Sequence, residues 1–269
     1  MAKENHLIAS LPRDVYEKLA PHLQYVLLKQ GQRLYEPGET IKEIYFPIDC
    51  LLSITITMSD GTVVETGMVG CREMLGINVF LGGRETTQTE SAVQIPGSAI
   101  KADAQMWRKE FDCNQELRNI LLSYAQAFIV QVSQTAACNR THVLEHRLAR
   151  WLLEAHDRIN SDELRLTHEF IATTLGVRRA GVTQAAQNLQ DRGLIQYSRG
   201  RIHILNQGGL EAFSCECFEG VTKALEGLLY KVEGSQPPLI KRKLIANKME
   251  AFCHPFLTQV KSSYPIVTI

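Results

Sequence analysis

The sequence lacks the features that mark several large classes of protein. Lys and Arg together number 29, as do Asp and Glu, so the overall charge gives no sign of a nucleic-acid or membrane partner. Residues 119–139 are uncharged, but their Gln, Asn, Ser and Thr side chains are too polar for a bilayer. Residues 1–10 are charged and contain no long apolar core, so we expect no signal peptide and a cytoplasmic location.

Common catalytic motifs are also absent. The chain has no GxxxxGK phosphate loop, HExxH metalloprotease motif, GxSxG nucleophile turn or GxGxxG dinucleotide loop. Glu65 and Glu73 are carboxylates, but no motif pairs them for acid/base work. From the sequence we therefore expect that the protein is not an enzyme and that it has no catalytic residue and no cofactor.

Cysteines are scattered along the chain and form no CxxC pair. The chain has seven cysteines. Zinc or iron–sulfur sites normally have ligands closer together in the sequence than these cysteines are, so we expect reduced and mostly buried thiols. Cys215 and Cys217 are the one suggestive pair, and with Cys138 they leave a thiol redox sensor open as an alternative. His142 and His146 could share a helical face, but a third ligand is not identifiable. No metal site is predicted.

One stretch, residues 168–190, carries the strongest positive pattern. Apolar residues recur at helical spacing in two runs separated by a glycine: Ile171, Ala172 and Leu175, then Gly176, then Val182, Ala185 and Leu189. Glycine ends a helix readily because it adopts the left-handed conformation without steric cost. Residues 170–190 contain no Asp or Glu, which suits a surface that approaches phosphates. The pattern predicts a helix-turn-helix, although a plain helical hairpin would share it.

A predicted β-hairpin directly after this stretch favours DNA binding. Residues 194–197 and 201–205 alternate as strands, and a Ser-Arg-Gly turn joins them. Two helices joined by a plain turn need not be followed by such a β-hairpin, whereas a winged helix requires one. We expect the second helix and the wing to contact double-stranded DNA through Arg178, Arg179, Thr183, Gln184, Gln187, Arg199 and Arg201.

The front of the chain is dominated by short strands. From residue 26 to about 100, strand patterns alternate with turns, which indicates an antiparallel barrel or roll. A long helix follows from about residue 114 to 138. Its apolar residues have a 4-3-4 spacing that predicts a dimer seam: Leu117, Leu121, Tyr124 and Phe128. Further apolar residues off this seam suggest that the helix is covered both by its own barrel and by a partner chain. The alternative is a core helix of a monomer.

The predicted fold class is therefore α+β, with an N-terminal antiparallel β-roll, a long dimerisation helix and a C-terminal winged helix-turn-helix. We expect the roll at residues 1–112, the dimerisation helix at 113–139, the winged domain at 140–234 and a tail of unknown role at 235–269. Residues 1–112 hold 11 basic and 15 acidic side chains, whereas 140–203 hold 10 and 7. A mildly acidic front and a mildly basic rear fit a sensor joined to a DNA-binding domain.

This order of elements resembles the Crp/Fnr family of bacterial transcription regulators. The resemblance covers about residues 10–210 and rests on residues 37–39 (Pro-Gly-Glu), Gly76, residues 90–92 (Glu-Ser-Ala), and residues 171–195 with the wing. It implies a cytoplasmic homodimer that reads an inverted repeat with half-sites about one helical turn apart. It also implies that Thr167 caps the first helix of the motif and touches phosphate. RNA polymerase is a further candidate partner, and no membrane partner is expected.

The chain departs from the cyclic-nucleotide-binding members of this family. Those members hold the ribose with a Glu and the cyclic phosphate with an Arg-Ser pair, at positions occupied here by Ile77 and by Glu90 and Ser91. A carboxylate beside a phosphate repels it, so the effector pocket at Gly76, Ile77, Glu90 and Ser91 is expected to be degenerate and not to bind cyclic AMP in the usual way. Residues 1–49 contain no Cys, which argues against the N-terminal iron–sulfur cluster of the oxygen-sensing members.

Two functions from different classes thus stay open. The first is a sequence-specific, homodimeric transcription regulator. In the resembled family an Arg-Glu pair commonly reads guanine and cytosine, whereas this chain has Arg179 and Ala180, so a different operator is expected. The second is a ligand-binding or thiol-redox sensor module whose winged helix serves protein interaction. The exposed arginines and the acid-free helix favour the first.

Overall fold

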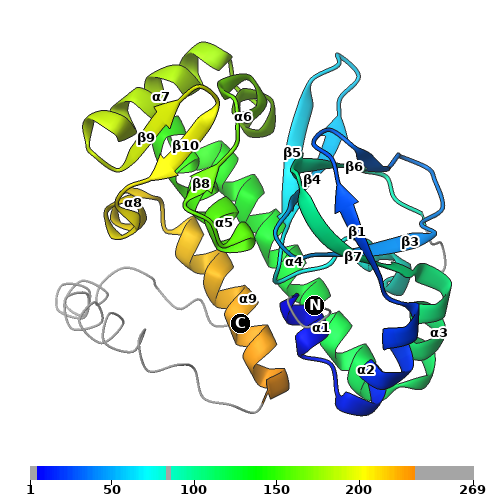
Figure 1. Cartoon of the computed structure of the whole chain (residues 1–269). Helices are drawn as coiled ribbons and strands as arrows, with labels where there is room; N and C mark the ends of the chain where they lie inside the picture. The colour runs from blue at the N-terminus through cyan, green and yellow to red at the C-terminus, as the bar shows by residue number, and fades with distance from the viewer. Residues whose placement is uncertain (1–4, 83–85, 234–269) are drawn as a thin grey trace, which may run out of the picture. The chain divides into compact units, whose positions relative to one another are not determined.

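The computed structural model describes residues 5–82 and 86–233. A β-roll comes first, followed by a long helix and a winged helical domain, as the sequence predicts (Figure 1). The tail predicted for residues 235–269 lies outside the described residues. None of the described helices is long and apolar enough to span a membrane.

The roll is built from two antiparallel sheets in the described part of the chain. One sheet has the strand order β1-β7-β3 and the other β2-β6-β4-β5. Two short helices, α1 (His6–Ala9) and α2 (Arg13–Leu19), and a 3-10 turn (Ala20–His22) precede it. The strands are β1 (Gln24–Leu28), β2 (Arg33–Tyr35), β3 (Glu43–Pro47), β4 (Leu51–Thr57), β5 (Val63–Val69), β6 (Glu90–Ile95) and β7 (Gly97–Asp103).

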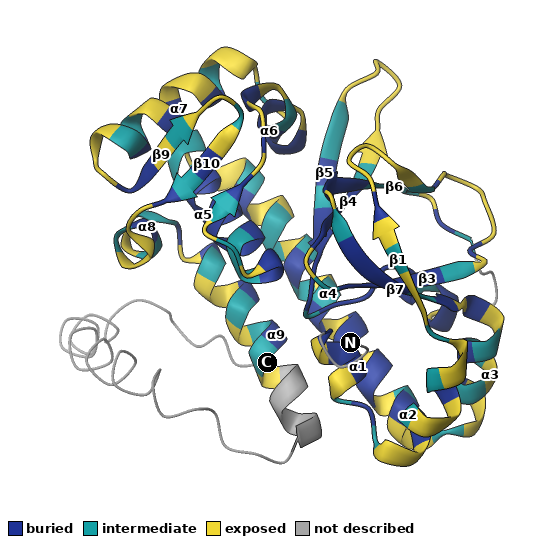
Figure 2. Ribbon diagram, viewed as in Figure 1, coloured by how far each residue is buried: buried dark blue, intermediate teal, exposed yellow. Residues whose placement is uncertain are grey.

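The core of the roll lies between these sheets and the helices that follow them (Figure 2). Trp107 on α3 (Ala104–Cys113) is fully buried, and its ring lies 4.8 Å from the ring of Phe46 on β3. Asn114 then caps the long helix α4 (Gln115–Thr141), because its side chain accepts a hydrogen bond from the amide of Leu117. The sequence placed the start of this helix correctly and its end three residues early.

The predicted dimer seam of α4 lies against the roll of the same chain. Leu117, Leu121 and Tyr124 are at most 4% exposed and belong to the roll core, and Phe128 packs against that core. Tyr124 also donates a hydrogen bond to the carbonyl of Met74, 2.8 Å away. These residues therefore do not offer a free surface to a partner chain, and their spacing reflects packing inside one chain.

A different stripe of α4 is exposed. It is shifted by five residues from the predicted seam and keeps the 4-3-4-3 spacing. Leu122 is 43% exposed and Ile129 is 59% exposed, so two large apolar side chains lie on this stripe. We call this set the free stripe of α4: Leu122, Gln126, Ile129, Ser133 and Ala136.

The winged domain begins with helix α5 (Leu144–Ile159) and contains a three-stranded sheet of order β8-β10-β9. Strand β8 is only two residues long, and it was not predicted from the sequence because so short a segment shows no alternation. The remaining elements are β8 (Glu163–Leu164), α6 (His168–Leu175), α7 (Arg179–Asp191), β9 (Ile195–Ser198), β10 (Arg201–Ile204), α8 (Gln207–Phe213) and α9 (Cys217–Glu233).

Buried polar contacts join the winged domain to the roll. Glu65 on β5 is buried and accepts hydrogen bonds from Trp151 on α5 (2.9 Å) and from Gln94 on β6 (3.2 Å). Gln94 also donates to the hydroxyl of Thr174 on α6, 3.2 Å away. Because α6 is the first helix of the predicted helix-turn-helix, these contacts link the orientation of that motif to the second sheet of the roll.

Glu65 makes the stability of this contact depend on pH. Burial raises the pKa of Glu65 to about 7 from an ordinary value of 4.5, although hydrogen bonds from Ser53 and Trp151 oppose the shift. The folded chain thus holds a proton on this group more tightly than the unfolded chain. The stabilisation is complete below pH 4.5 and is lost as the pH rises through about 7.

Glu65→Gln should therefore flatten the fall in unfolding free energy between about pH 5 and about pH 8, by an amount on the order of 3 kcal/mol. Urea titrations of both proteins across this range measure the difference. Glu17→Gln is the control, because Glu17 is exposed on α2. Parallel profiles for wild type and Glu65→Gln would show that the carboxyl of Glu65 does not titrate in this range.

Candidate nucleic-acid interface

The helix-turn-helix is formed by α6, a tight turn and α7. The hydroxyl of Thr167 accepts a hydrogen bond from the amide of Phe170, so Thr167 caps α6 as expected. Gly176 has φ +63° and ends α6, and its amide and that of Val177 bond back to the carbonyls of Thr173 and Ala172. The predicted boundary between the two helices is therefore confirmed.

Helix α7 buries one face and exposes the other. Its buried residues are Val182, Ala185, Ala186 and Leu189, which join the core of the winged domain. The residues predicted to read DNA on this helix are all exposed: Arg178, Arg179, Thr183, Gln184 and Gln187. We call these five side chains the reading face.

Hydrogen bonds within the chain occupy part of the reading face. The hydroxyl of Thr183 lies 3.1 Å from the ring of His168 and donates to the carbonyl of Arg179. Gln187 donates to Asp191 at 2.7 Å. The hydroxyl of Thr183 thus supports the joint between α6 and α7, and it is less available to a base edge than the sequence suggested.

Acidic side chains flank the reading face, although residues 170–190 contain none. Glu169 lies just before this range and approaches Arg179, with 3.9 Å between carboxylate and guanidinium. Both side chains are about 70% exposed, and exposed ion pairs of this kind contribute about 0–1 kcal/mol. Arg179 can therefore exchange Glu169 for a guanine or a phosphate at small cost.

The wing is a β-hairpin beside α7, and a two-residue turn joins its strands β9 and β10. Arg199 and Gly200 both have positive φ, +49° and +76°, which is the turn geometry that matches the twist of a hairpin. Arg199 and Arg201 are exposed at its tip. Arg201 lies 3.8 Å from Glu163 on β8, so the third strand places a carboxylate next to one of the predicted phosphate contacts.

His168 is a positioning residue that was not predicted from the sequence. Its ring stacks on Tyr197 of the wing, with 3.8 Å between ring centroids, and it contacts Thr183 on α7. Burial, together with the positive charge of Arg179, lowers the pKa of His168. The neutral ring therefore joins the start of α6, the reading helix and the wing.

A cavity of about 240 Å³ lies in the roll, where the effector pocket was predicted. Gly76, Ile77 and Ser91 line it, together with apolar and hydroxyl-bearing side chains from the strands and from α4. Glu90 is not part of the lining, and its carboxylate lies 3.4 Å from the guanidinium of Arg33. The structure thus brings three of the four predicted pocket residues together. The fourth, Glu90, forms an ion pair and does not line the cavity.

The charge argument against a cyclic phosphate changes accordingly. A cyclic phosphate needs a positive partner, and no Lys or Arg lies among the described residues that line the cavity. The hydroxyl of Ser91 is buried without a hydrogen-bond partner in the described structure. Among the described lining residues, the lack of a cation, rather than repulsion by Glu90, is what argues against binding of an anion.

The geometry defines a class of fold: a winged helix-turn-helix that follows a roll of the cyclic-nucleotide-binding type. Residues 146–213 match the family model for the Crp-like helix-turn-helix domain. The match falls on the winged helix-turn-helix, from α5 to α8.

Other proteins and solved structures are similar to this chain along most of its length. The global nitrogen regulator of Synechococcus elongatus is 22% identical over 215 residues, which cover 77% of this chain and 96% of that protein. FixK2 from Bradyrhizobium japonicum has a TM-score of 0.62 at 15% identity, over 72% of this chain and 98% of that one. A Crp/Fnr regulator from Eubacterium rectale has a TM-score of 0.60 at 19% identity, over 77% and 96%.

Arg179→Ala should remove base preference at one position of each half-site, because Ala180 cannot replace a bidentate contact to guanine. The expected loss is about 1–3 kcal/mol per half-site on the preferred base and much less on the others. Fluorescence anisotropy with duplexes that vary one base pair at a time measures both affinity and preference.

Arg13→Ala provides the matched control, because Arg13 is an equally charged and 92% exposed residue on α2 of the roll. This variant should leave both quantities unchanged. If Arg179→Ala also keeps wild-type affinity and base preference, Arg179 does not lie in the major groove.

Proposed function

We propose that this protein is a homodimeric, sequence-specific regulator of transcription that binds an inverted-repeat operator in double-stranded DNA. The observation that carries the proposal is the reading face of α7, which is exposed next to a wing whose tip carries Arg199 and Arg201. A helix that presents Arg and Gln side chains at one edge fits a major groove, and arginines on a hairpin beside it fit the flanking phosphates.

The free stripe of α4 is the surface proposed for the partner chain. Its 4-3-4-3 spacing is that of a two-stranded coiled coil, and it places Leu122 and Ile129 where a second copy of α4 would cover them. A two-fold axis along this helix would relate two reading faces, so half-sites about 34–36 Å apart are expected. RNA polymerase stays a candidate partner of the bound dimer.

The sensor part of the proposal is that the roll does not use cyclic AMP in the usual way. The described lining of the cavity supports this, because it is mostly apolar and its described residues supply hydroxyl groups and no guanidinium. A neutral ligand with an apolar body and one or two hydrogen-bonding groups matches such a lining better than a phosphate does.

Selection of bound duplexes from a randomised pool, with and without cyclic AMP, tests the regulator. We expect one inverted repeat to be enriched equally in both selections. Enrichment that requires the nucleotide would overturn the inference about the cavity. A pool that stays random in both selections, with a purified and folded dimer, would favour a winged helix that serves protein interaction.

Ile129→Asp tests the dimer surface separately. Two aspartates facing each other across a two-fold axis replace an apolar contact, so the dimer dissociation constant should rise at least about tenfold. Sedimentation equilibrium measures this change. Met58→Asp is the control, because Met58 is 54% exposed in the turn after β4 and lies outside the free stripe. A monomeric wild type, or an unchanged Ile129→Asp dimer, would contradict the assignment.

A further inference from the structure

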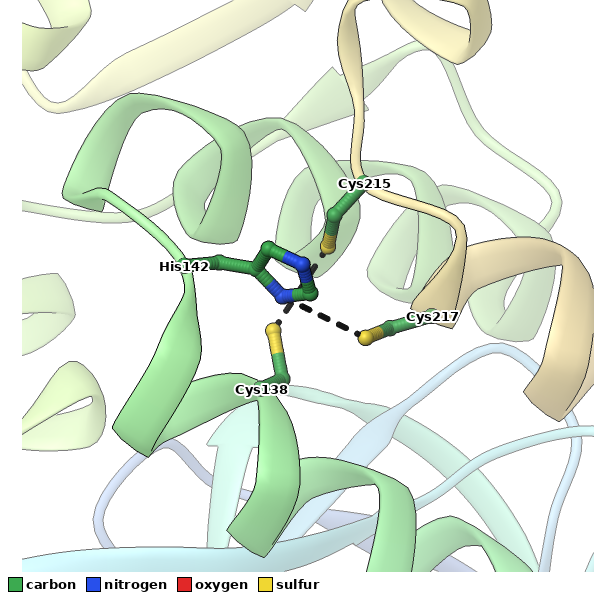
Figure 3. A group of neighbouring side chains, drawn as sticks. All are labelled: Cys138, His142, Cys215 and Cys217. Atoms are coloured by element: carbon green, nitrogen blue, oxygen red, sulfur yellow. Dashed lines mark hydrogen bonds between the residues drawn. The ribbon is translucent and has the colours of Figure 1, made fainter. Parts of the chain in front are cut away.

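Four metal-ligating side chains converge at the end of the long helix. Cys138 comes from the last turn of α4, His142 from the turn before α5, and Cys215 and Cys217 from the connection into α9 (Figure 3). Their ligand atoms all lie within 4.8 Å of one another, and the three cysteines are buried. No metal site was predicted from the sequence, because ligands lie near each other along the chain only in pairs. Folding brings two such pairs together.

Local chain geometry explains each pair. Cys138 and His142 are four residues apart, so they lie on one face where α4 ends. Cys215 and Cys217 flank a single residue at the start of α9, and the positive end of a helix dipole stabilises thiolates. His146, which the sequence paired with His142, packs edge-on against Phe213 instead, with 5.0 Å between ring centroids.

The distances suit one tetrahedral ion. The sulfurs of Cys138 and Cys215 are 3.5 Å apart, and the sulfur of Cys217 is 3.5 Å from Nδ1 of His142. With metal–sulfur bonds of about 2.3 Å and metal–nitrogen bonds of about 2.0 Å, a tetrahedral site has edges of about 3.8 Å between sulfurs and about 3.5 Å between sulfur and nitrogen. A disulfide would require the sulfurs to approach to about 2.05 Å.

The surroundings orient the ligands as metal sites commonly do. The carboxylate of Glu216 lies 3.3 Å from Nε2 of His142, which holds a proton on that nitrogen and leaves Nδ1 free to bind. Gln134 donates a hydrogen bond to the sulfur of Cys217 at 3.1 Å. Arg147 is buried and interacts electrostatically with Cys138 and Cys215, so its charge offsets the net negative charge of three thiolates and one divalent cation.

We propose that Cys138, His142, Cys215 and Cys217 bind one Zn²⁺ ion in a closed, structural site. Three thiolates and an imidazole form the soft, four-coordinate ligand set that zinc prefers, and they leave no open position for a substrate. Binding releases the protons of the three thiols to solvent, and the zinc is neither oxidised nor reduced.

The ion would fasten α9 to α4 where the winged domain begins. Further along α9, Val221 and Leu225 form a small apolar cluster with Ala127 of α4. So small a cluster contributes little by itself, whereas a structural zinc ion contributes many kcal/mol to the segments it joins. The zinc site would thereby fix the joint between the dimerisation helix and the DNA-binding domain.

Metal analysis of the purified full-length chain, with matched cysteine variants, tests the proposal. We expect close to one zinc per chain in the wild type and in Cys113→Ser, because Cys113 is exposed at the end of α3 and far from the ligand set in the sequence. Cys138→Ser and Cys215→Ser should each lose most of the metal. Cobalt substituted into the wild type should give the thiolate charge-transfer and tetrahedral d–d absorption bands, and these should weaken in both variants.

A reversible measurement guards against variants that fail to fold. Chelation of the wild type should lower its melting temperature, and added zinc should restore it. A reduced wild-type protein that contains no zinc and takes none up would overturn the proposal. So would a mass lower by two hydrogens that places a disulfide between Cys138 and Cys215, or iron and sulfide bound in place of zinc.

Discussion

The structure depends on keeping the charges inside helix α5 compensated. Arg158 is 3% exposed, and its guanidinium lies 2.8 Å from the carboxylate of Glu73, in the turn after β5. One turn earlier on the same helix, Glu154 and Arg150 form a second buried pair at 2.8 Å. An uncompensated buried charge costs several kcal/mol, so loss of any one partner would penalise the whole set.

The pair of Arg158 and Glu73 joins α5 of the winged domain to the roll, and Glu154 and Arg150 continue the buried charges along α5. Gly70 makes the approach possible: a Cβ at that position would lie 2.2 Å from the Cβ of Arg158. The amide of Cys71 bonds to the carbonyl of Arg158 at 2.9 Å. Polar partners of this kind are directional, so they specify one docking geometry where apolar contacts alone would tolerate several.

The reading face, the cavity and the proposed zinc site are all connected to this frame. α5 packs against α7 and α8 on one side and against β4 on the other. α4, which lines the cavity through Tyr124 and Phe128, also supplies Cys138 to the proposed zinc site. A ligand that repacks the cavity would therefore act on the helix that leads to the DNA-binding domain, which gives the proposed sensor a physical route to the reading face.

The sequence alone determined the elements whose signals are local. The glycine turn after α6, the cap at Thr167, the wing turn at Gly200 and the periodicity of α7 depend on residues close together in the chain, and all were predicted correctly. Only the tertiary structure decided which face of α4 is buried, that Glu90 pairs with Arg33 outside the cavity, and that His142 meets three cysteines. These outcomes join residues far apart in sequence, and spacing within one segment carries no information about what packs against it.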